Sequence, residues 1–138
     1  MGWIRALLVW LLLMIAEVIH GTIRTLWLAP AVGDFKARQI SVFTGSTIIL
    51  AIAFLCIRWI GFAKSSRLIA VGILWLTLTL LFEIGLGHFA FGYSWERIGE
   101  DYNILNGGLL PVGLLALMLS PLIAAKLRRI GIDRQTAD

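Results

Sequence analysis

The chain has 138 residues, of which 59% are hydrophobic and only 14% are charged, and its mean hydropathy is +0.91. Soluble domains carry about 25% charged residues, so this composition excludes an ordinary soluble protein and indicates a membrane protein. The net charge of +4 reflects basic loops that fix orientation in the lipid bilayer rather than a nucleic-acid partner. The single cysteine, Cys56, lies in an apolar run, which excludes a disulfide framework and a cysteine metal site.

Four apolar runs are each long enough to cross a bilayer, which needs about 20 residues per helix. They cover residues 4–27, 40–60, 68–90 and 104–125. No small-residue cleavage site follows the first run, so we expect it to be retained rather than removed as a signal peptide. The pattern predicts an all-α fold with one domain over residues 1–138. This domain is an integral membrane bundle of four transmembrane helices with a polar loop at residues 93–102 and a basic tail at residues 126–138.

The orientation follows from the positions of Lys and Arg, which gather on cytoplasmic loops. Eight of the 12 lie at the N-terminus, around the turn between the second and third runs, and in the tail: Arg5, Arg58, Lys64, Arg67, Lys126, Arg128, Arg129 and Arg134. The other four are Arg24, Lys36, Arg38 and Arg97. We therefore expect both termini to be cytoplasmic, in a bacterial cytoplasmic membrane.

The two halves of the chain resemble each other weakly. Glu17 in the first run corresponds to Glu83 in the third, and a histidine follows each of these acids. Such a pattern suggests a parallel two-fold internal repeat, related by an axis along the membrane normal.

Polar residues gather at one depth of the predicted bundle. Glu17, His20 and Arg24 share one stripe of the first helix. Ionisable groups at membrane depth cost roughly 2.5–3.5 kcal/mol each on insertion scales, so the stripe is expected to face protein or water. The predicted site also takes residues from the other three runs, and its members are Glu17, His20, Arg24, Arg38, Ser41, Thr44, Glu83 and Asn106. The predicted outer rim consists of His88, Trp95, Asp101 and Tyr102.

Two further patterns concern the walls of this site. Trp75, Thr79, Glu83 and Gly87 recur every four residues and form a second inward stripe. The fourth run opens with Asn106-Gly107-Gly108 and predicts irregular backbone beside the site, which membrane proteins tolerate only where protein or water satisfies it.

Three functions are compatible with this cluster. The leading hypothesis is a small transport or binding protein that takes a small polar or ionic solute, or protons. In it, Glu17 and Glu83 are the titrating or cation-binding groups, and Arg24 and Arg38 balance their charge or hold an anion. An alternative is a redox subunit in which His20 and His88 ligate a b-type haem, with Arg24 and Arg38 beside its propionates. The third is an accessory subunit of a membrane complex, in which the cluster only holds the helices in register.

The sequence carries no catalytic triad, phosphate-binding loop or dinucleotide fingerprint, which favours a role other than catalysis. No cofactor is predicted by the leading hypothesis. Four short spans enclose little volume, so we expect a homo-oligomer or a larger membrane complex.

Overall fold

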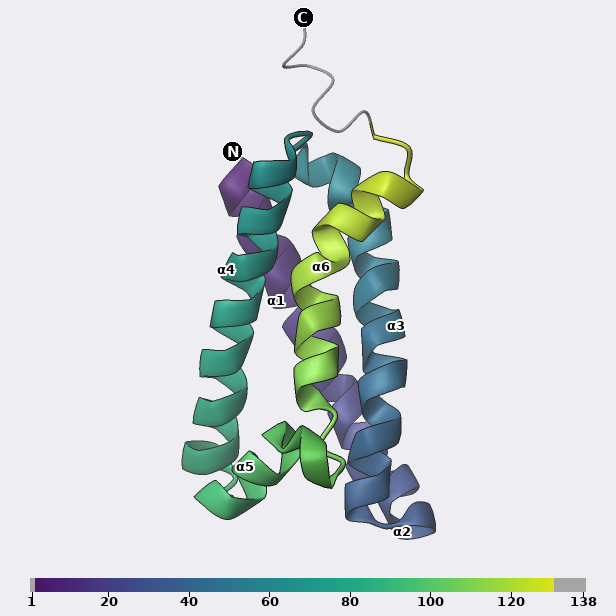
Figure 1. The fold of residues 1–138 in the computed structure, drawn as a ribbon, viewed down its shortest axis with the longest axis vertical. Helices are drawn as coiled ribbons and strands as arrows, with labels where there is room; N and C mark the ends of the chain where they lie inside the picture. Colours follow the sequence, from purple (N-terminus) through teal and green to yellow (C-terminus); the bar gives the residue numbers. More distant parts are fainter. Residues whose placement is uncertain (1, 131–138) are drawn as a thin grey trace, which may run out of the picture.

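The computed structural model describes residues 2–130 and contains only helices and connecting turns in that range (Figure 1). The elements in chain order are α1 (Gly2–Ile23), η1 (Arg24–Leu28), α2 (Ala29–Val32), α3 (Asp34–Ile60), α4 (Ser65–Gly85), η2 (Leu86–Ala90), α5 (Trp95–Tyr102), η3 (Ile104–Asn106) and α6 (Leu110–Leu127). Four stretches are long and apolar enough to cross a membrane: Gly2–Val32, Asp34–Ile60, Ser65–Ala90 and Leu110–Leu127. The all-helical prediction is therefore confirmed, and the end of the tail, residues 131–138, lies outside the described residues.

The first membrane-length stretch continues past the predicted end at residue 27. Pro30 does not stop it, because it lies in the first turn of α2, where a backbone N–H is not needed. The stretch ends at Gly33, whose φ of 96° is open to glycine but strained for other residues. The second spanning helix begins before the predicted residue 40, because residues 34–39 form the first turns of α3. Asp34 lies at the N-terminal end of this helix, where an acidic side chain is favourable.

The predicted polar loop at residues 93–102 contains the short helix α5. Its N-cap is Ser94, whose hydroxyl oxygen accepts a hydrogen bond from the backbone N–H of Arg97. The last spanning helix begins at Leu110 rather than residue 104. Between α5 and α6 the backbone makes only the short turn η3 and then a glycine with φ of 91°, Gly107, in agreement with the predicted irregular segment.

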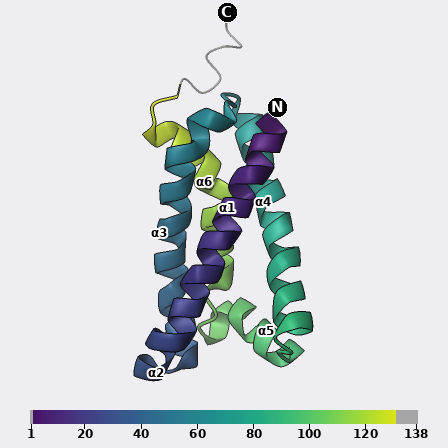
Figure 2. The same cartoon turned by 180° about the vertical axis from the view of Figure 1, so that it is seen from behind.

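The helices form a bundle in which α6 lies between α3 and α4, while α1 crosses the opposite face (Figures 1 and 2). The start of α1, the α3–α4 turn and the end of α6 lie at one end, here called the basic end. The turn before α3 and the helix α5 lie at the other, here called the α5 end. Helices α1 and α4 are close at the basic end and diverge toward the α5 end (Figure 2).

The basic half of the bundle has a packed core. Trp75 of α4 is fully buried, and its indole N–H donates to the carbonyl oxygen of Ala6 in α1 at 2.9 Å. Trp10 donates to the Thr79 hydroxyl at 3.0 Å, which joins the same two helices one step further along. Large apolar side chains such as Leu55 and Leu81 point outward, as expected for helices surrounded by lipid.

Close packing of α4 against α6 depends on Gly72. A Cβ atom at this position would overlap the backbone carbonyl of Met118 on α6, so only a residue without a side chain fits. Small residues allow helix backbones to approach closely where no hydrophobic effect drives them together.

We expect Gly72→Ala to lower the free energy of unfolding by about 1–3 kcal/mol, because the backbones of α4 and α6 must separate. Thermal unfolding of the detergent-purified protein measures the change. Gly85→Ala on the same helix is the matched control, since a Cβ there meets no described atom within 4 Å. Equal melting temperatures for the two variants would contradict the packing described.

Candidate functional site

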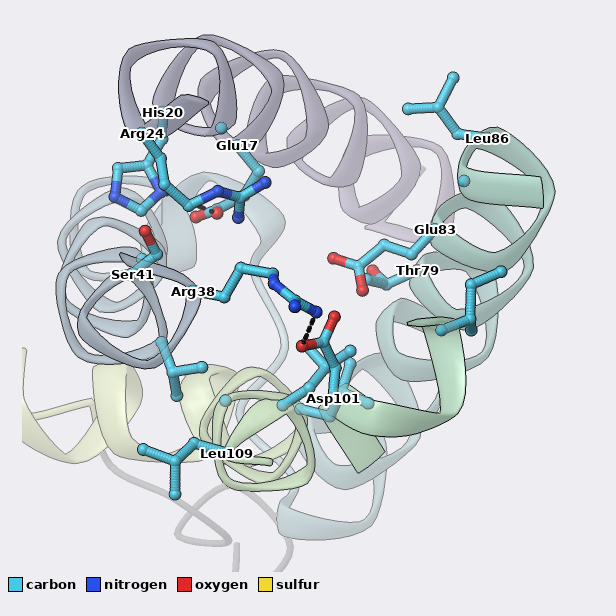
Figure 3. A pocket seen from close by; sticks show the side chains of 18 of the residues that line it. Glu17, His20, Arg24, Arg38, Ser41, Thr79, Glu83, Leu86, Asp101 and Leu109 are labelled. Carbon is cyan, nitrogen blue, oxygen red and sulfur yellow. Dashed lines mark hydrogen bonds and ion pairs between the residues drawn. The ribbon is translucent and has the colours of Figure 1, made fainter. Parts of the chain in front are cut away.

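A cavity of about 510 Å³ lies in the α5 half of the bundle, between the four long helices and beneath α5 (Figure 3). Its size is within the range of small-molecule sites, roughly 300–1,000 Å³. Charged and polar side chains come from every long helix except α6, and from α5. The principal ones are Glu17, His20, Arg24, Arg38, Gln39, Ser41, Thr79, Glu83, Arg97, Asp101 and Tyr102.

Arg38 joins α3 to α5 at the outer wall of the cavity. Its Nη1 donates to Asp101, and its Nη2 lies 3.3 Å from a carboxylate oxygen of Glu100. Its Nε lies 3.2 Å from Asp34, one turn earlier on α3. The arginine side chain is only 10% exposed, so three carboxylates surround a charge that is largely withdrawn from water. A second pair, Arg97 with Asp34 at 2.8 Å, strengthens the attachment of α5.

Burial shifts the pKa of two cavity-lining groups of α5, Asp101 and Tyr102. It raises the pKa of Asp101 above its ordinary value, and the nearby guanidinium groups, Arg38 first among them, oppose this shift without cancelling it. Burial, followed by the charges of Glu83 and Asp101, raises the pKa of Tyr102 to about 12. The phenol therefore keeps its proton across the physiological range and is available as a hydrogen-bond donor.

Glu17 occupies the contact between α1 and α3. Its carboxylate lies 3.5 Å from Nδ1 of His20, and Nε2 of the same ring is 2.7 Å from the Thr44 hydroxyl on α3. The space for the carboxylate exists because Gly45 faces it: a Cβ there would lie 3.1 Å from Glu17 Oε2. Ser41 and Gly45, which lie one turn apart on α3, are both buried at this contact.

Glu83 and Arg24 enter the cavity from opposite sides. Glu83 projects from α4, one turn after Thr79. Arg24 projects from the first membrane-length stretch, two turns after Glu17 (Figure 3). Within residues 2–130, no hydrogen bond or ion pair within 4 Å holds either side chain to another residue. The cavity thus contains a carboxylate and a guanidinium without direct partners in the described part of the chain.

Four buried side-chain atoms lack a hydrogen-bond partner among the described residues, and all four belong to residues that line the cavity. They are Glu17 Oε1, Arg38 Nε, Ser41 Oγ and the Tyr102 hydroxyl. Of these, only Arg38 Nε has a charged neighbour, Asp34. Unsatisfied buried polar atoms are rare in native proteins and call for a functional explanation.

The structure brings most of the predicted site together. Six of its residues line the cavity: Glu17, His20, Arg24, Arg38, Ser41 and Glu83. Thr44 does not line the cavity but contacts two residues that do, His20 and the carbonyl oxygen of Ser41. Asn106 is exposed and is not among the lining residues.

The predicted rim divides into two pairs. Asp101 and Tyr102 line the cavity itself. The rings of His88 and Trp95 stack on each other at 3.9 Å and are not among the lining residues.

Sequence reasoning left most of the lining residues out of the site, among them the polar residues Gln39, Thr79 and Arg97. Gln39 donates from its side-chain amide to the carbonyl oxygen of Gly107 at 2.7 Å, which attaches the irregular segment to α3. Thr79 belonged to the predicted inward stripe of the third run but was not included in the site. Arg97 was counted only for its charge, although Asp101 and Tyr102 of the same helix were predicted at the rim.

No protein-family model matches the chain, and neither curated proteins nor solved structures show significant similarity to it. Fold and site therefore define its class: a helical protein with four helices apolar enough to span a membrane, enclosing a charged cavity near one end.

Arg38→Gln should lower the free energy of unfolding by about 1–3 kcal/mol, since it leaves Asp101 without its main partner. This range is smaller than for a fully buried ion pair, because the carboxylate is partly exposed to solvent. The loss should depend on pH. A carboxyl whose pKa is higher in the folded state binds its proton more tightly there, so its contribution to stability is present at low pH and lost as pH rises. Removing Arg38 raises the pKa of Asp101 further. The variant should therefore be more destabilised near pH 8 than near pH 5.

Chemical unfolding at the two pH values measures this difference. Arg58→Gln provides the control, because Arg58 is exposed at the basic end of the same helix and, within residues 2–130, donates a hydrogen bond only to the carbonyl oxygen of Arg128. An equal loss at both pH values would show that Asp101 does not titrate as described.

Proposed function

We propose that the protein binds a small solute with a positively charged group in this cavity and carries it across the membrane. One observation supports this proposal above the others. Glu17 and Glu83 face one cavity from α1 and α4, and neither forms an ion pair with a lysine or arginine within the described residues. Acids at membrane depth are costly and are usually retained for function.

The balance of charge in the cavity favours a cation over an anion. Arg38 and Arg97 are already matched by the carboxylates of Asp34, Glu100 and Asp101. Glu17 contacts only His20, and Glu83 has no charged partner within 4 Å in residues 2–130. Two carboxylates are thus available to an ammonium group, against the single guanidinium of Arg24.

Transport also requires a barrier on the far side of the site. Between the cavity and the basic end, Val9, Leu13, Val71 and Trp75 are at most 2% exposed and form a packed core. A solute bound near the α5 end is therefore separated from the basic end, and its passage requires this packing to rearrange. Movement of packed helices past one another is an established way of alternating access.

The haem alternative receives less support from the side chains. Both ring nitrogens of His20 face partners, Glu17 and Thr44. The Nδ1 of His88 lies 3.0 Å from the Tyr93 carbonyl oxygen, and its ring is stacked on Trp95. A haem between the two histidines would require both rings to leave these positions, and His88 to enter a cavity that it does not line.

The proposal includes an orientation and an assembly. The excess of Lys and Arg at the basic end supports cytoplasmic termini, and the even number of spanning helices agrees with termini on one side. In a bacterial cytoplasmic membrane the cavity then opens toward the outside. The proposed parallel repeat relates Glu17 to Glu83, which line the same cavity. A homo-oligomer or larger complex remains our expectation from the small size of the bundle.

We expect Glu17→Gln and Glu83→Gln to abolish uptake of labelled ethanolamine, a small ammonium probe, into proteoliposomes, since each removes a negative charge and preserves shape. The control is Glu96→Gln, which neutralises an exposed acid of α5 that does not line the cavity. Melting temperatures measured in parallel separate the alternatives. Normal uptake with lowered stability in the two cavity variants would indicate the structural role instead.

The orientation has its own test. With Cys56 replaced by alanine, a cysteine introduced at the exposed Asn103 should react with a membrane-impermeant maleimide in intact cells. A cysteine at the exposed Ser66 should react only after the cells are opened. The reverse pattern would place the cavity on the cytoplasmic side.

A further inference from the structure

The cavity changes from apolar to charged along the bundle axis. Its inner part is lined by Met14, Ile49, Phe82, Leu114 and Leu117. Its outer part, beneath α5, is lined by Arg24, Arg38, Arg97 and Asp101. Leu117 lies seven residues into α6 from Leu110, a depth of about 10 Å at 1.5 Å per residue. A ligand that fills the cavity therefore contacts charge at one end and hydrocarbon at the other.

The cavity also reaches the side of the bundle. Its lining includes Val18 and Leu26 of the first span, which are 46% and 59% exposed, and also Ile84 of α4 and Leu86 of η2. Helices α1 and α4 diverge toward the α5 end (Figure 2), and Leu86 lies on the α4 side of the cavity (Figure 3). Because this face of a spanning helix meets lipid, the opening between α1 and α4 leads into the bilayer.

The order of polarity in the cavity matches that of a lipid leaflet. A leaflet places headgroups at the surface and chains toward the centre, and the cavity places Arg38 and Asp101 near the end of the spans and Leu117 toward their middle. The volume of about 510 Å³ is enough for a headgroup and part of one chain. The remainder of the chain would extend through the lateral opening.

The unpaired groups define the headgroup. Glu17 and Glu83 accept hydrogen bonds from an ammonium group, while Arg24 is available to an anionic group such as a phosphate. A headgroup with one positive and one negative group pairs with all three side chains. Because such a headgroup is neutral overall, its binding leaves the net charge of the cavity unchanged.

We infer that the ligand is an amphiphile with an ammonium-bearing zwitterionic headgroup, and that it enters sideways from the bilayer between α1 and α4. The inference rests on the proposed function, since it assigns a class of ligand to the same carboxylates. It adds the acyl chain and the lateral route, neither of which a water-soluble solute requires.

Native mass spectrometry of the detergent-purified protein tests the inference with three probes. Lysophosphatidylethanolamine has the headgroup and the chain, glycerophosphoethanolamine has only the headgroup, and lysophosphatidylglycerol has the chain without the ammonium. We expect the dissociation constant of the first probe to be at least about 100-fold lower than that of the second, because each CH₂ group of the acyl chain that is buried adds to the free energy of binding. It should also bind about tenfold or more tightly than the third.

Two variants on one helix test the lateral route. Val18→Trp, which narrows the opening, should weaken binding of lysophosphatidylethanolamine about tenfold. Ile15→Trp is the matched control, because Ile15 is equally apolar, is 59% exposed and does not line the cavity. Equal effects of the two variants would overturn the lateral route.

The probes separate failure of the inference from failure of the proposed function. Suppose that lysophosphatidylethanolamine and glycerophosphoethanolamine bind equally well and that Glu17→Gln abolishes the binding of both. This result would overturn the inference that the ligand is an amphiphile, and would leave the proposed soluble solute with an ammonium group. Equal binding of both lysolipids would show that only the chain is recognised, which overturns the assigned headgroup. No binding of any probe to a folded protein would overturn both proposals.

Discussion

A charged side chain at membrane depth is stable only where protein or water surrounds it, and the α5 half of this bundle is arranged around that constraint. Glu17, Arg24 and Glu83 come from helices that meet lipid on their other faces, yet all three point into one cavity (Figure 3). The apolar residues of the same helices point outward. The cavity is therefore the place where the chain concentrates the polar groups that it cannot expose.

Arg38 determines how this cavity is closed. Its contacts with Glu100 and Asp101 hold α5 across the end of the bundle, and Asp34 connects both Arg38 and Arg97 to the start of α3. The hydrogen bond from Gln39 to Gly107 then fixes the segment that leads into α6. Because these interactions join α3 to α5, a change in the charge of the cavity acts directly on its cover. This coupling suits a binding site that must open and close.

Small residues decide which half of the bundle is packed and which is hollow. Gly72 lets α4 approach the backbone of α6, and in the basic half Trp75 fills the core against Ala6. In the α5 half, Gly45 leaves room for the Glu17 carboxylate. Helices α1 and α4 diverge in this half (Figure 2), and the cavity lies between them. A packed half and a hollow half thus follow each other along the axis of the bundle.

The sequence by itself determined the class of the fold and the core of the candidate site. Long apolar runs make spanning helices unavoidable, and helical periodicity placed Glu17, His20 and Arg24 on one inward stripe. It did not determine the start of α6, the helix within residues 93–102, or the exclusion of Asn106 from the cavity. These depend on tertiary contacts, since α5 is held by ion pairs to residues more than 60 positions earlier in the chain. Only the tertiary structure decided which acids pair with Arg38 and which remain unpaired, because that choice depends on distances between helices rather than on spacing within them.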